Sequence, residues 1–254
     1  MMSVIPIPAL RDNYIWMLPL TTQPDRVVIV DPGEAAPVGA ALDRLGLQPA
    51  AILVTHHHLD HTGGISELQR RHRLAVFGPA GASPAVDHPI ADGMTVRLGD
   101  LELRVMAVPG HTLEHVAYYA PGMLLCGDTL FGAGCGRLFE GTPAQMYESL
   151  MKFAALPEDT RVYCSHEYTA ANLAFAAAVE PDNEDVRARI ERVALLRASG
   201  RPSLPSTIGE ELRTNPFLRC REPDVSAAAR RHAGTEVNGE LGVFTALRRW
   251  KDVF

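Results

Sequence analysis

Residues 55–61 read Thr-His-His-His-Leu-Asp-His, and this heptapeptide constrains the fold and chemistry of the chain more than any other segment. It follows the apolar run of residues 51–54, so a buried strand is expected to end where the polar cluster begins. Imidazole suits zinc and iron, and a carboxylate adds charge and can hold a second ion. A solvated histidine-rich loop or a purification tag is the alternative, but a tag would lie at a terminus and carry no Asp at this spacing. The cluster therefore predicts metal ligands: His56, His58, Asp60 and His61.

Three more ligand-type side chains follow apolar runs later in the chain. The runs 101–108, 123–126 and 161–164 are strand-like and are bounded by turn residues. One such side chain alone is more often an ordinary loop residue, but three at successive strand ends favour a shared site. Four ligands in one turn cannot close a dinuclear site, so these residues are expected to complete it: His111, Asp128 and His166.

Taken in order, these residues resemble the metallo-β-lactamase superfamily and, within it, the glyoxalase II (hydroxyacylglutathione hydrolase) family. The resemblance covers nearly the whole chain. The first histidine cluster is common to the superfamily, whereas a Gly-Cys-Gly-Arg segment and a basic C-terminus narrow the match. The further segments that carry it are Asp12-Asn13-Tyr14-Ile15-Trp16, Gly127-Asp128-Thr129, Gly134-Cys135-Gly136-Arg137, His166-Glu167-Tyr168 and Arg248-Arg249-Trp250-Lys251.

The fold implied by the resemblance is α/β, an αββα sandwich of the metallo-β-lactamase type with a C-terminal all-α domain. We expect a catalytic domain over residues 1–166 and a helical substrate-binding domain over residues 167–254, because short β-rich runs give way to helical patterns near residue 167. A helix should begin at Ser206 or Thr207, with Glu210 in its first turn. An apolar stripe is expected on another helix, at Val186, Ile190, Val193 and Leu196. The expected strands are 27–31, 51–55, 74–77, 101–108, 116–120, 123–126 and 161–164, and the expected helices are 64–72, 143–156, 167–179, 182–199 and 238–252.

The resemblance also implies how the ligands are shared between two divalent metal ions, for which zinc is expected and iron and manganese are alternatives. One ion would take His56, His58 and His111, the other would take Asp60, His61 and His166, and Asp128 would bridge them. Solvent on such a centre has its pKa lowered to about 7, which makes hydroxide available at neutral pH. The implied reaction is hydrolysis of S-(2-hydroxyacyl)glutathione, typically S-D-lactoylglutathione, to glutathione and D-lactate. It is the second step of methylglyoxal detoxification.

The roles of several residues in or near the predicted ligand turn need separate consideration. Asp60 is expected to be a catalytic residue that also orients the hydroxide. Asp31 is either a hydrogen-bond partner of a ligand histidine or a turn-initiating Asp before Pro32. His57 is expected not to ligate. Glu114 stands where the family usually has Gly, which leaves the conformation of that loop open.

Substrate recognition is expected to rest on positive charge, because glutathione carries two carboxylates and one ammonium. For Arg248 and Lys251 there is an alternative interpretation: they could form an exposed end of an amphipathic helix, where cations interact favourably with the helix dipole. Arg137 replaces the Lys of many relatives and should allow a bidentate carboxylate contact. Phe139 replaces a Tyr found in some relatives. The residues implied are Arg137, Phe139, Tyr168, Asn172, Arg248 and Lys251.

Composition is consistent with a monomeric enzyme of the cytoplasm that acts on a small molecule. The net charge of −6 argues against nucleic acid as a partner, and no apolar run approaches about 18 residues, so no membrane helix is expected. No signal-peptide pattern is present, and the four cysteines form no C-x-x-C pair. The alternatives are a lactonase of the same fold, a glutathione persulfide dioxygenase and a metal-stabilised binding module.

Overall fold

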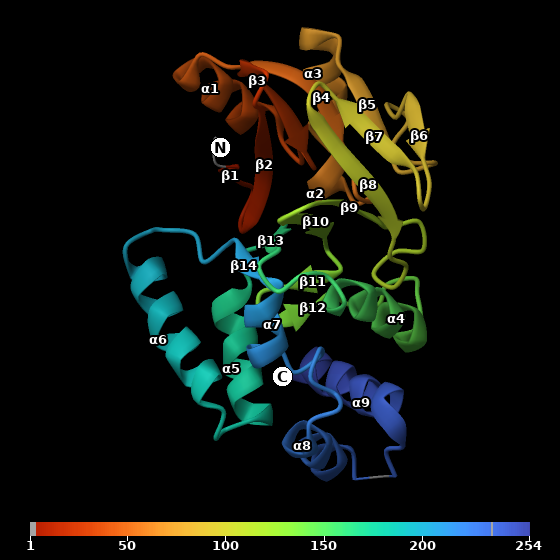
Figure 1. Ribbon diagram of the computed structural model, residues 1–254, viewed down its shortest axis with the longest axis vertical. Coiled ribbons are helices and arrows are strands. Elements are labelled where there is room, and N and C mark those ends of the chain that lie inside the picture. Colours follow the sequence, from red (N-terminus) through yellow and green to blue (C-terminus); the bar gives the residue numbers. More distant parts are fainter. Residues whose placement is uncertain (1–3, 235) are drawn as a thin grey trace. The chain divides into compact units, whose positions relative to one another are not determined.

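The computed structural model describes residues 4–234 and 236–254, and it separates into two compact units (Figure 1). The first unit comprises Met1–Ala107 and Glu114–Gly127, and the second comprises Val108–Leu113 and Asp128–Phe254. The short segment Val108–Leu113 thus belongs to the second unit, although the residues before it and the segment Glu114–Gly127 after it belong to the first. Within the described ranges, no helix is both long and apolar enough to cross a bilayer.

The first unit contains a six-stranded sheet in the order β1-β2-β3-β4-β5-β6. The first three strands pair antiparallel, and β3 to β6 pair parallel. Parallel neighbours need a crossover connection, and helix α1 lies in the one from β3 to β4 and helix α3 in the one from β4 to β5. The strands are β1 Ile5–Ala9, β2 Asn13–Leu20, β3 Gln23–Val30, β4 Gln48–Leu53, β5 Ala75–Pro79 and β6 His88–Ile90; the helices are α1 Ala35–Leu45, α2 Leu59–Thr62 and α3 Ile65–His72.

Successive side chains of a strand point to opposite faces of the sheet, and both faces of this sheet are apolar. Ile15 and Ile29 belong to a buried cluster that also contains Val38 of α1 and Leu68 of α3, so one face is covered by these helices. The opposite face meets an antiparallel meander of four strands, in which the Tyr118 hydroxyl donates to the carbonyl oxygens of residues 54 (2.7 Å) and 77 (3.3 Å). Burial raises the pKa of Tyr118 well above its ordinary value. The meander strands are β7 Thr95–Leu98, β8 Leu101–Ala107, β9 Val116–Ala120 and β10 Met123–Gly127.

The second unit is mainly helical. Helix α5 packs against α6, and α9 packs against both α8 and α4. A capping box formed by Thr142 and Gln145, with Pro143 in the first turn, begins α4. The elements are the hairpin β11 Leu130–Phe131 and β12 Gly134–Cys135, the pair β13 Arg161–Cys164 and β14 Ser206–Thr207, and the helices α4 Pro143–Ala154, α5 Thr169–Val179, α6 Glu184–Ala198, α7 Ile208–Thr214, α8 Pro223–Ala233 and α9 Gly239–Val253.

The predicted strands and helices are present, with ends shifted by a few residues. Thr207, not Ser206, begins α7, because its side chain accepts a hydrogen bond from the Glu210 N–H. Ser206 belongs to the short strand β14, a strand within the segment expected to be entirely helical. The sequence prediction missed β1, β2, β6, β7, β11, β12, α1, α2 and α8.

The apolar stripe predicted for α6 is partly wrong. Val186 and Val193 are buried, but Ile190 is 36% exposed and Arg189 is 1% exposed. The Arg189 guanidinium donates to the Glu211 carboxylate at 2.6 Å, so a buried ion pair occupies the position expected for an aliphatic side chain. Spacing alone could not reveal this, because the partner lies on α7.

Candidate metal centre

The ligand turn of the first unit begins where β4 ends. His56 is buried directly after the strand, and α2 begins after His58, so Asp60 and His61 lie on the first turn of that short helix. The backbone of this turn lies against Gly33, where an added Cβ would come within 2.0 Å of the Asp60 carbonyl oxygen. Only glycine allows this close approach. The end of β4 and the close contact with Gly33 thus determine where the ligand turn lies in the first unit.

Hydrogen bonds within the first unit orient two of these side chains. The Asp31 carboxylate accepts from the Thr55 N–H (2.8 Å) and lies 3.1 Å from Nδ1 of the His61 ring. A proton on Nδ1 leaves Nε2 available as a ligand atom, so the contact favours Asp31 as a histidine partner over a mere turn residue. The Asn13 amide donates to Oδ2 of Asp60 at 3.0 Å. Asn13 is a residue of the site that the sequence analysis did not single out, because it lies 47 positions from its partner.

The second unit holds the other three predicted ligands close together. His111 precedes α4, Asp128 follows β10 and His166 follows β13. One Asp128 oxygen lies 3.5 Å from Nε2 of His111 and 3.3 Å from Nε2 of His166. Nδ1 of His111 donates to the Arg137 carbonyl oxygen at 2.9 Å, which leaves its Nε2 as the ligand atom. A buried carboxylate flanked by two imidazoles is suited to a shared cation.

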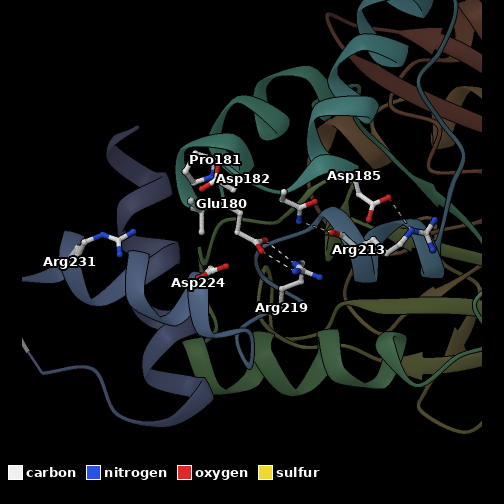
Figure 2. Close-up of a pocket in the computed structure, with 10 residues that line it drawn as sticks. Glu180, Pro181, Asp182, Asp185, Arg213, Arg219, Asp224 and Arg231 are labelled. Carbon is white, nitrogen blue, oxygen red and sulfur yellow. Dashed lines mark hydrogen bonds and ion pairs between the residues drawn. The ribbon is translucent and has the colours of Figure 1, made fainter.

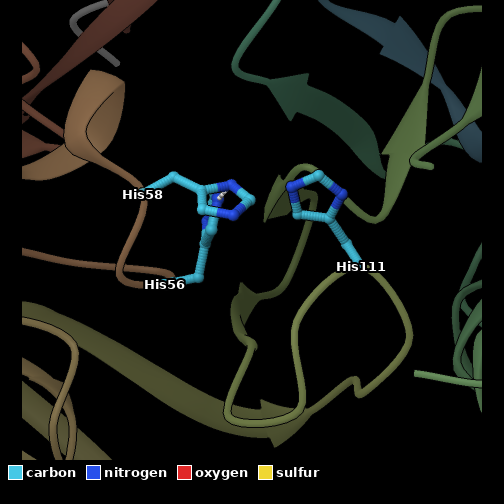
Figure 3. A group of neighbouring side chains, drawn as sticks. All are labelled: His56, His58 and His111. Atoms are coloured by element: carbon cyan, nitrogen blue, oxygen red, sulfur yellow. Dashed lines mark hydrogen bonds between the residues drawn. The ribbon is translucent and has the colours of Figure 1, made fainter. Parts of the chain in front are cut away.

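The seven predicted ligands lie in two sets, one in each unit. In the first unit, Nε2 of His56 lies 3.1 Å from Nδ1 of His58, and Nε2 of His61 lies 3.4 Å from an Asp60 oxygen. Figure 3 draws the imidazole rings of His56 and His58 on the ligand turn, together with the ring of His111. Five imidazoles and two carboxylates form an open nitrogen and oxygen donor set, which fits zinc, iron or manganese better than a closed structural zinc site.

Four residues predicted to bind substrate follow the β11–β12 hairpin or lie near α5. Arg137 is exposed, and Phe139 is 63% exposed with its ring centroid 5.2 Å from that of His111. Tyr168 is half-buried and stacks on His166 at 4.7 Å. Asn172 is buried, and its amide donates to the carbonyl oxygen of residue 132 at 3.1 Å. Asn172 therefore supports the hairpin, while the other three side chains are accessible.

The two cations predicted on α9 have different surroundings. Arg248 is 4% exposed and donates to the Cys135 carbonyl oxygen and to the Asp252 carboxylate, both at 2.9 Å. Its burial contradicts the alternative of an exposed helix end. Lys251 is half-buried, with Nζ 5.4 Å from the ring centroids of both Phe175 and Phe254. Burial, and then the charges of Arg248 and Arg137, lower the pKa of Lys251.

The cysteines are placed as the sequence analysis expected, in the core. All four are buried thiols. Burial raises the pKa of Cys164 to about 12 and also raises that of Cys135. A thiol held protonated in this way is a poor nucleophile and a poor metal ligand.

A separate polar cavity of about 420 Å³ lies in the second unit, where α5 ends and α6 begins (Figure 2). It contains none of the predicted ligands or substrate-binding residues. Arg219 pairs with Glu180 at 2.8 Å, and Arg213 lies 3.7 Å from Asp185. These opposite charges pair with each other.

Comparisons with known proteins agree with this geometry. Residues 15–166 match the model of the metallo-β-lactamase superfamily, and residues 167–254 match that of the hydroxyacylglutathione hydrolase C-terminus. The chain is 50% identical to a hydroxyacylglutathione hydrolase of Dechloromonas aromatica and 53% identical to one of Methylobacillus flagellatus, each aligned over 100% of both chains.

Solved structures share the fold. One is TTHA1623 in a di-iron-bound form, with a TM-score of 0.62 and 27% identity over 85% of this chain and 100% of that one. Another is ETHE1 from Myxococcus xanthus, with a TM-score of 0.65 and 24% identity over 87% of this chain and 91% of that one.

Proposed function

The chain belongs to the hydroxyacylglutathione hydrolase family of the metallo-β-lactamase superfamily, and we propose from this membership that it hydrolyses S-(2-hydroxyacyl)glutathione thioesters. The expected products are glutathione and a 2-hydroxy acid, with S-D-lactoylglutathione and D-lactate as the typical pair. The observation that carries the proposal is the match of both family models, which together span residues 15–254 and include all seven predicted ligands. A family relative that lacked these ligands would not be expected to catalyse the reaction.

The centre proposed here holds two divalent metal ions, with zinc expected and iron or manganese as alternatives. One ion would be held by His56, His58 and His111, the other by Asp60, His61 and His166, with Asp128 shared. When bound, such ions lower the pKa of a water molecule toward neutrality and polarise the thioester carbonyl. This supplies both the nucleophile and the electrophilic activation that a thioester needs.

The protein groups around the ligands then have defined tasks. Asp31 and the Arg137 carbonyl keep the protons of His61 and His111 on Nδ1, so that Nε2 of each ring stays available. Asp60, whose Oδ2 accepts a hydrogen bond from Asn13, would orient the attacking water. The leaving thiolate needs little protonation, because an ordinary thiol has a pKa of about 8.5. No separate general acid is required.

Glutathione recognition would use the cations near Cys135. Arg137 is exposed, and Lys251 has a pKa lowered in part by neighbouring positive charge. A carboxylate that binds between these cations relieves their mutual repulsion, so anion binding is favoured there. Phe139 and Tyr168 present aromatic surfaces beside His111 and His166 for the rest of the substrate.

The functional boundary is proposed at residues 166 and 167, with metal ligation before it and most thiol recognition after it. Helices α5 to α9 all follow this boundary, and His166 is the last ligand in the chain. We also propose that the protein is a monomer. We propose further that it is located in the cytoplasm, and the four free, buried cysteine thiols support this location. Size determination in solution and cell fractionation test these two points.

The experiment for the proposed function pairs elemental analysis with a thioester assay. S-D-lactoylglutathione should be cleaved by the purified protein, and a chelator should abolish cleavage until zinc, iron or manganese is restored. Asp128→Ala should lower the metal content from two ions per chain. Turnover of lactones but not of thioesters, or one tightly held metal that Asp128→Ala leaves unchanged, would refute the function or the dinuclear assignment respectively.

A further inference from the structure

Glu114 lies on the loop between β8 and β9, two residues before β9 begins, and its side chain reaches the ligand turn. Its backbone φ is not positive, so nothing in the conformation requires the glycine usual in relatives. We infer that Glu114 is a positioning residue, which holds the backbone between the two predicted ligands His56 and His58. The inference deepens the proposed function, because it rests on the proposed metal centre.

One carboxylate oxygen of Glu114 contacts the intervening residue twice. It accepts a hydrogen bond from the His57 N–H at 3.0 Å and lies 2.7 Å from Nδ1 of the His57 ring. The Glu114 and His57 side chains are 23% and 38% exposed, so the pair is partly shielded from water. The contact fixes the peptide that links His56 to His58, and not only a surface side chain.

Two further contacts show that the Glu114 loop runs alongside the ligand turn. The His115 ring stacks on His56, with centroids 4.6 Å apart and planes 18° apart. The next residue, Val116, donates its N–H to the Thr55 carbonyl oxygen at 2.9 Å. Successive residues 114, 115 and 116 thus contact residues 57, 56 and 55 in turn. Glu114 supplies the last of these contacts, next to His58.

The opposite side of the turn is also held. The Thr62 hydroxyl donates to the carbonyl oxygens of His57 (3.3 Å) and His58 (3.0 Å). Removing the Glu114 carboxylate would leave this side in place but free the His57 N–H. Groups that orient metal ligands from outside typically change metal affinity or activity by about 10- to 100-fold. Because Glu114 acts through backbone, we expect the lower end of that range, about 10-fold.

A different role for Glu114 is direct ligation. His57 and Glu114 offer a nitrogen and an oxygen ligand atom that lie 2.7 Å apart. The same Glu114 oxygen also accepts from the His57 N–H, as the oxygen of a positioning group does. A count of bound metal ions separates the two roles.

The test measures the rate at which the zinc-loaded protein loses metal to a chelator. Glu114→Ala should lose metal about 10-fold faster than the parent. Glu114→Gln keeps an oxygen acceptor for the His57 N–H and should lie closer to the parent. His57→Ala keeps the backbone contact and should have less effect than Glu114→Ala. Glu102→Ala, which removes an exposed carboxylate that pairs with Arg97 away from the ligand turn, is the control and should change the rate less than about twofold.

Three outcomes would overturn the inference. The first is an unchanged rate of metal loss in Glu114→Ala. The second is loss of a third equivalent of metal, which would make Glu114 a ligand. The third is an equal fall in melting temperature for the metal-free and the metal-loaded Glu114→Ala proteins, which would make the contact merely structural. The readout needs no substrate, so a protein that loses metal faster but cleaves no glutathione thioester would refute only the proposed function.

Discussion

The ligand turn over residues 56–61 and the end of helix α9 over residues 248–251 each concentrate functional side chains in a few positions, but they differ in how they do so. In the turn, four predicted ligands follow one strand end, and Asp31, Asn13 and Glu114 contact the turn from other segments. On α9, two cations three positions apart have unlike surroundings: Arg248 is buried against a backbone carbonyl, and Lys251 lies against aromatic rings. The spacing of a motif therefore predicts ligands at a strand end better than it predicts the role of a charge on a helix.

The strongest test of the turn is Asp60→Asn, which removes a ligand charge and the group proposed to orient water while keeping the shape of the side chain. We expect kcat to fall by about 10²- to 10³-fold, the scale for loss of one preorganised group at a reacting centre. Steady-state kinetics and elemental analysis measure the effect. Asn13→Ala, which removes only the hydrogen bond to Asp60, should cost less. A kcat of Asp60→Asn within threefold of the parent would remove Asp60 from the mechanism.

For the α9 end, Arg248→Ala should act mainly on stability. It leaves the Cys135 carbonyl without its buried donor and removes the cation from the Phe217 ring, so the free energy of unfolding should fall by about 2–3 kcal/mol. Urea denaturation measures this. Arg248→Lys should restore part of the stability because a shorter cation remains. An Arg248→Ala protein of unchanged stability but much higher KM would show that Arg248 binds substrate directly.

Lys251→Ala should act mainly on substrate affinity, which completes the contrast within α9. We expect KM for the glutathione thioester to rise about 10-fold, the effect of losing one charge-assisted contact, with metal content unchanged. The double variant Arg248→Ala with Lys251→Ala should also keep both metals. Arg249→Ala, an exposed cation on the same turn, is the matched control. A fall in metal content with unchanged KM would contradict the proposed division between the two parts of the chain.

The smallest expected effect is on the pH dependence of binding. Because the pKa of Lys251 is lowered, this residue loses its proton below the pH at which an ordinary lysine does, about 10.4. Substrate affinity should therefore weaken as pH rises through that lowered pKa. The free energy of unfolding should change in the opposite direction. The protonated lysine is disfavoured in the folded state, so this cost fades, and stability rises, as pH increases from the folded pKa toward the ordinary pKa. Lys251→Arg should flatten the alkaline part of the KM profile; a profile identical to that of the parent would refute the assignment.

The candidate ligands could be picked out from the sequence because each follows an apolar run that can be recognised locally. The supporting residues could not. Asn13 reaches Asp60 from 47 positions away and Glu114 reaches His57 from 57 positions away, and only the fold brings these pairs together. The burial of Arg248 depends likewise on the Cys135 carbonyl, 113 positions earlier.

Parts of the fold escaped prediction for local reasons. Strand β1 contains Pro6 and Pro8, and proline ordinarily argues against a strand interior; β1 lies at the edge of its sheet, where proline is tolerated. Helix α1 contains Pro37 and Gly39, which weaken its helical pattern. Its buried face, including Val38, packs into the apolar cluster beneath the sheet, and this packing outweighs the weak propensity.

The departure of residues 108–113 from the first unit has a consequence for biosynthesis. Strand β8 ends at Ala107, but β9, which pairs with it, begins only at Val116, after the excursion. During synthesis β8 leaves the ribosome before β9 does. Until β9 follows, one edge of β8 stays unpaired, and Leu103 and Val105, which are fully buried in the finished protein, are exposed. A nascent chain paused in this interval is thus open to wrong pairing, and slow translation there would favour aggregation over folding.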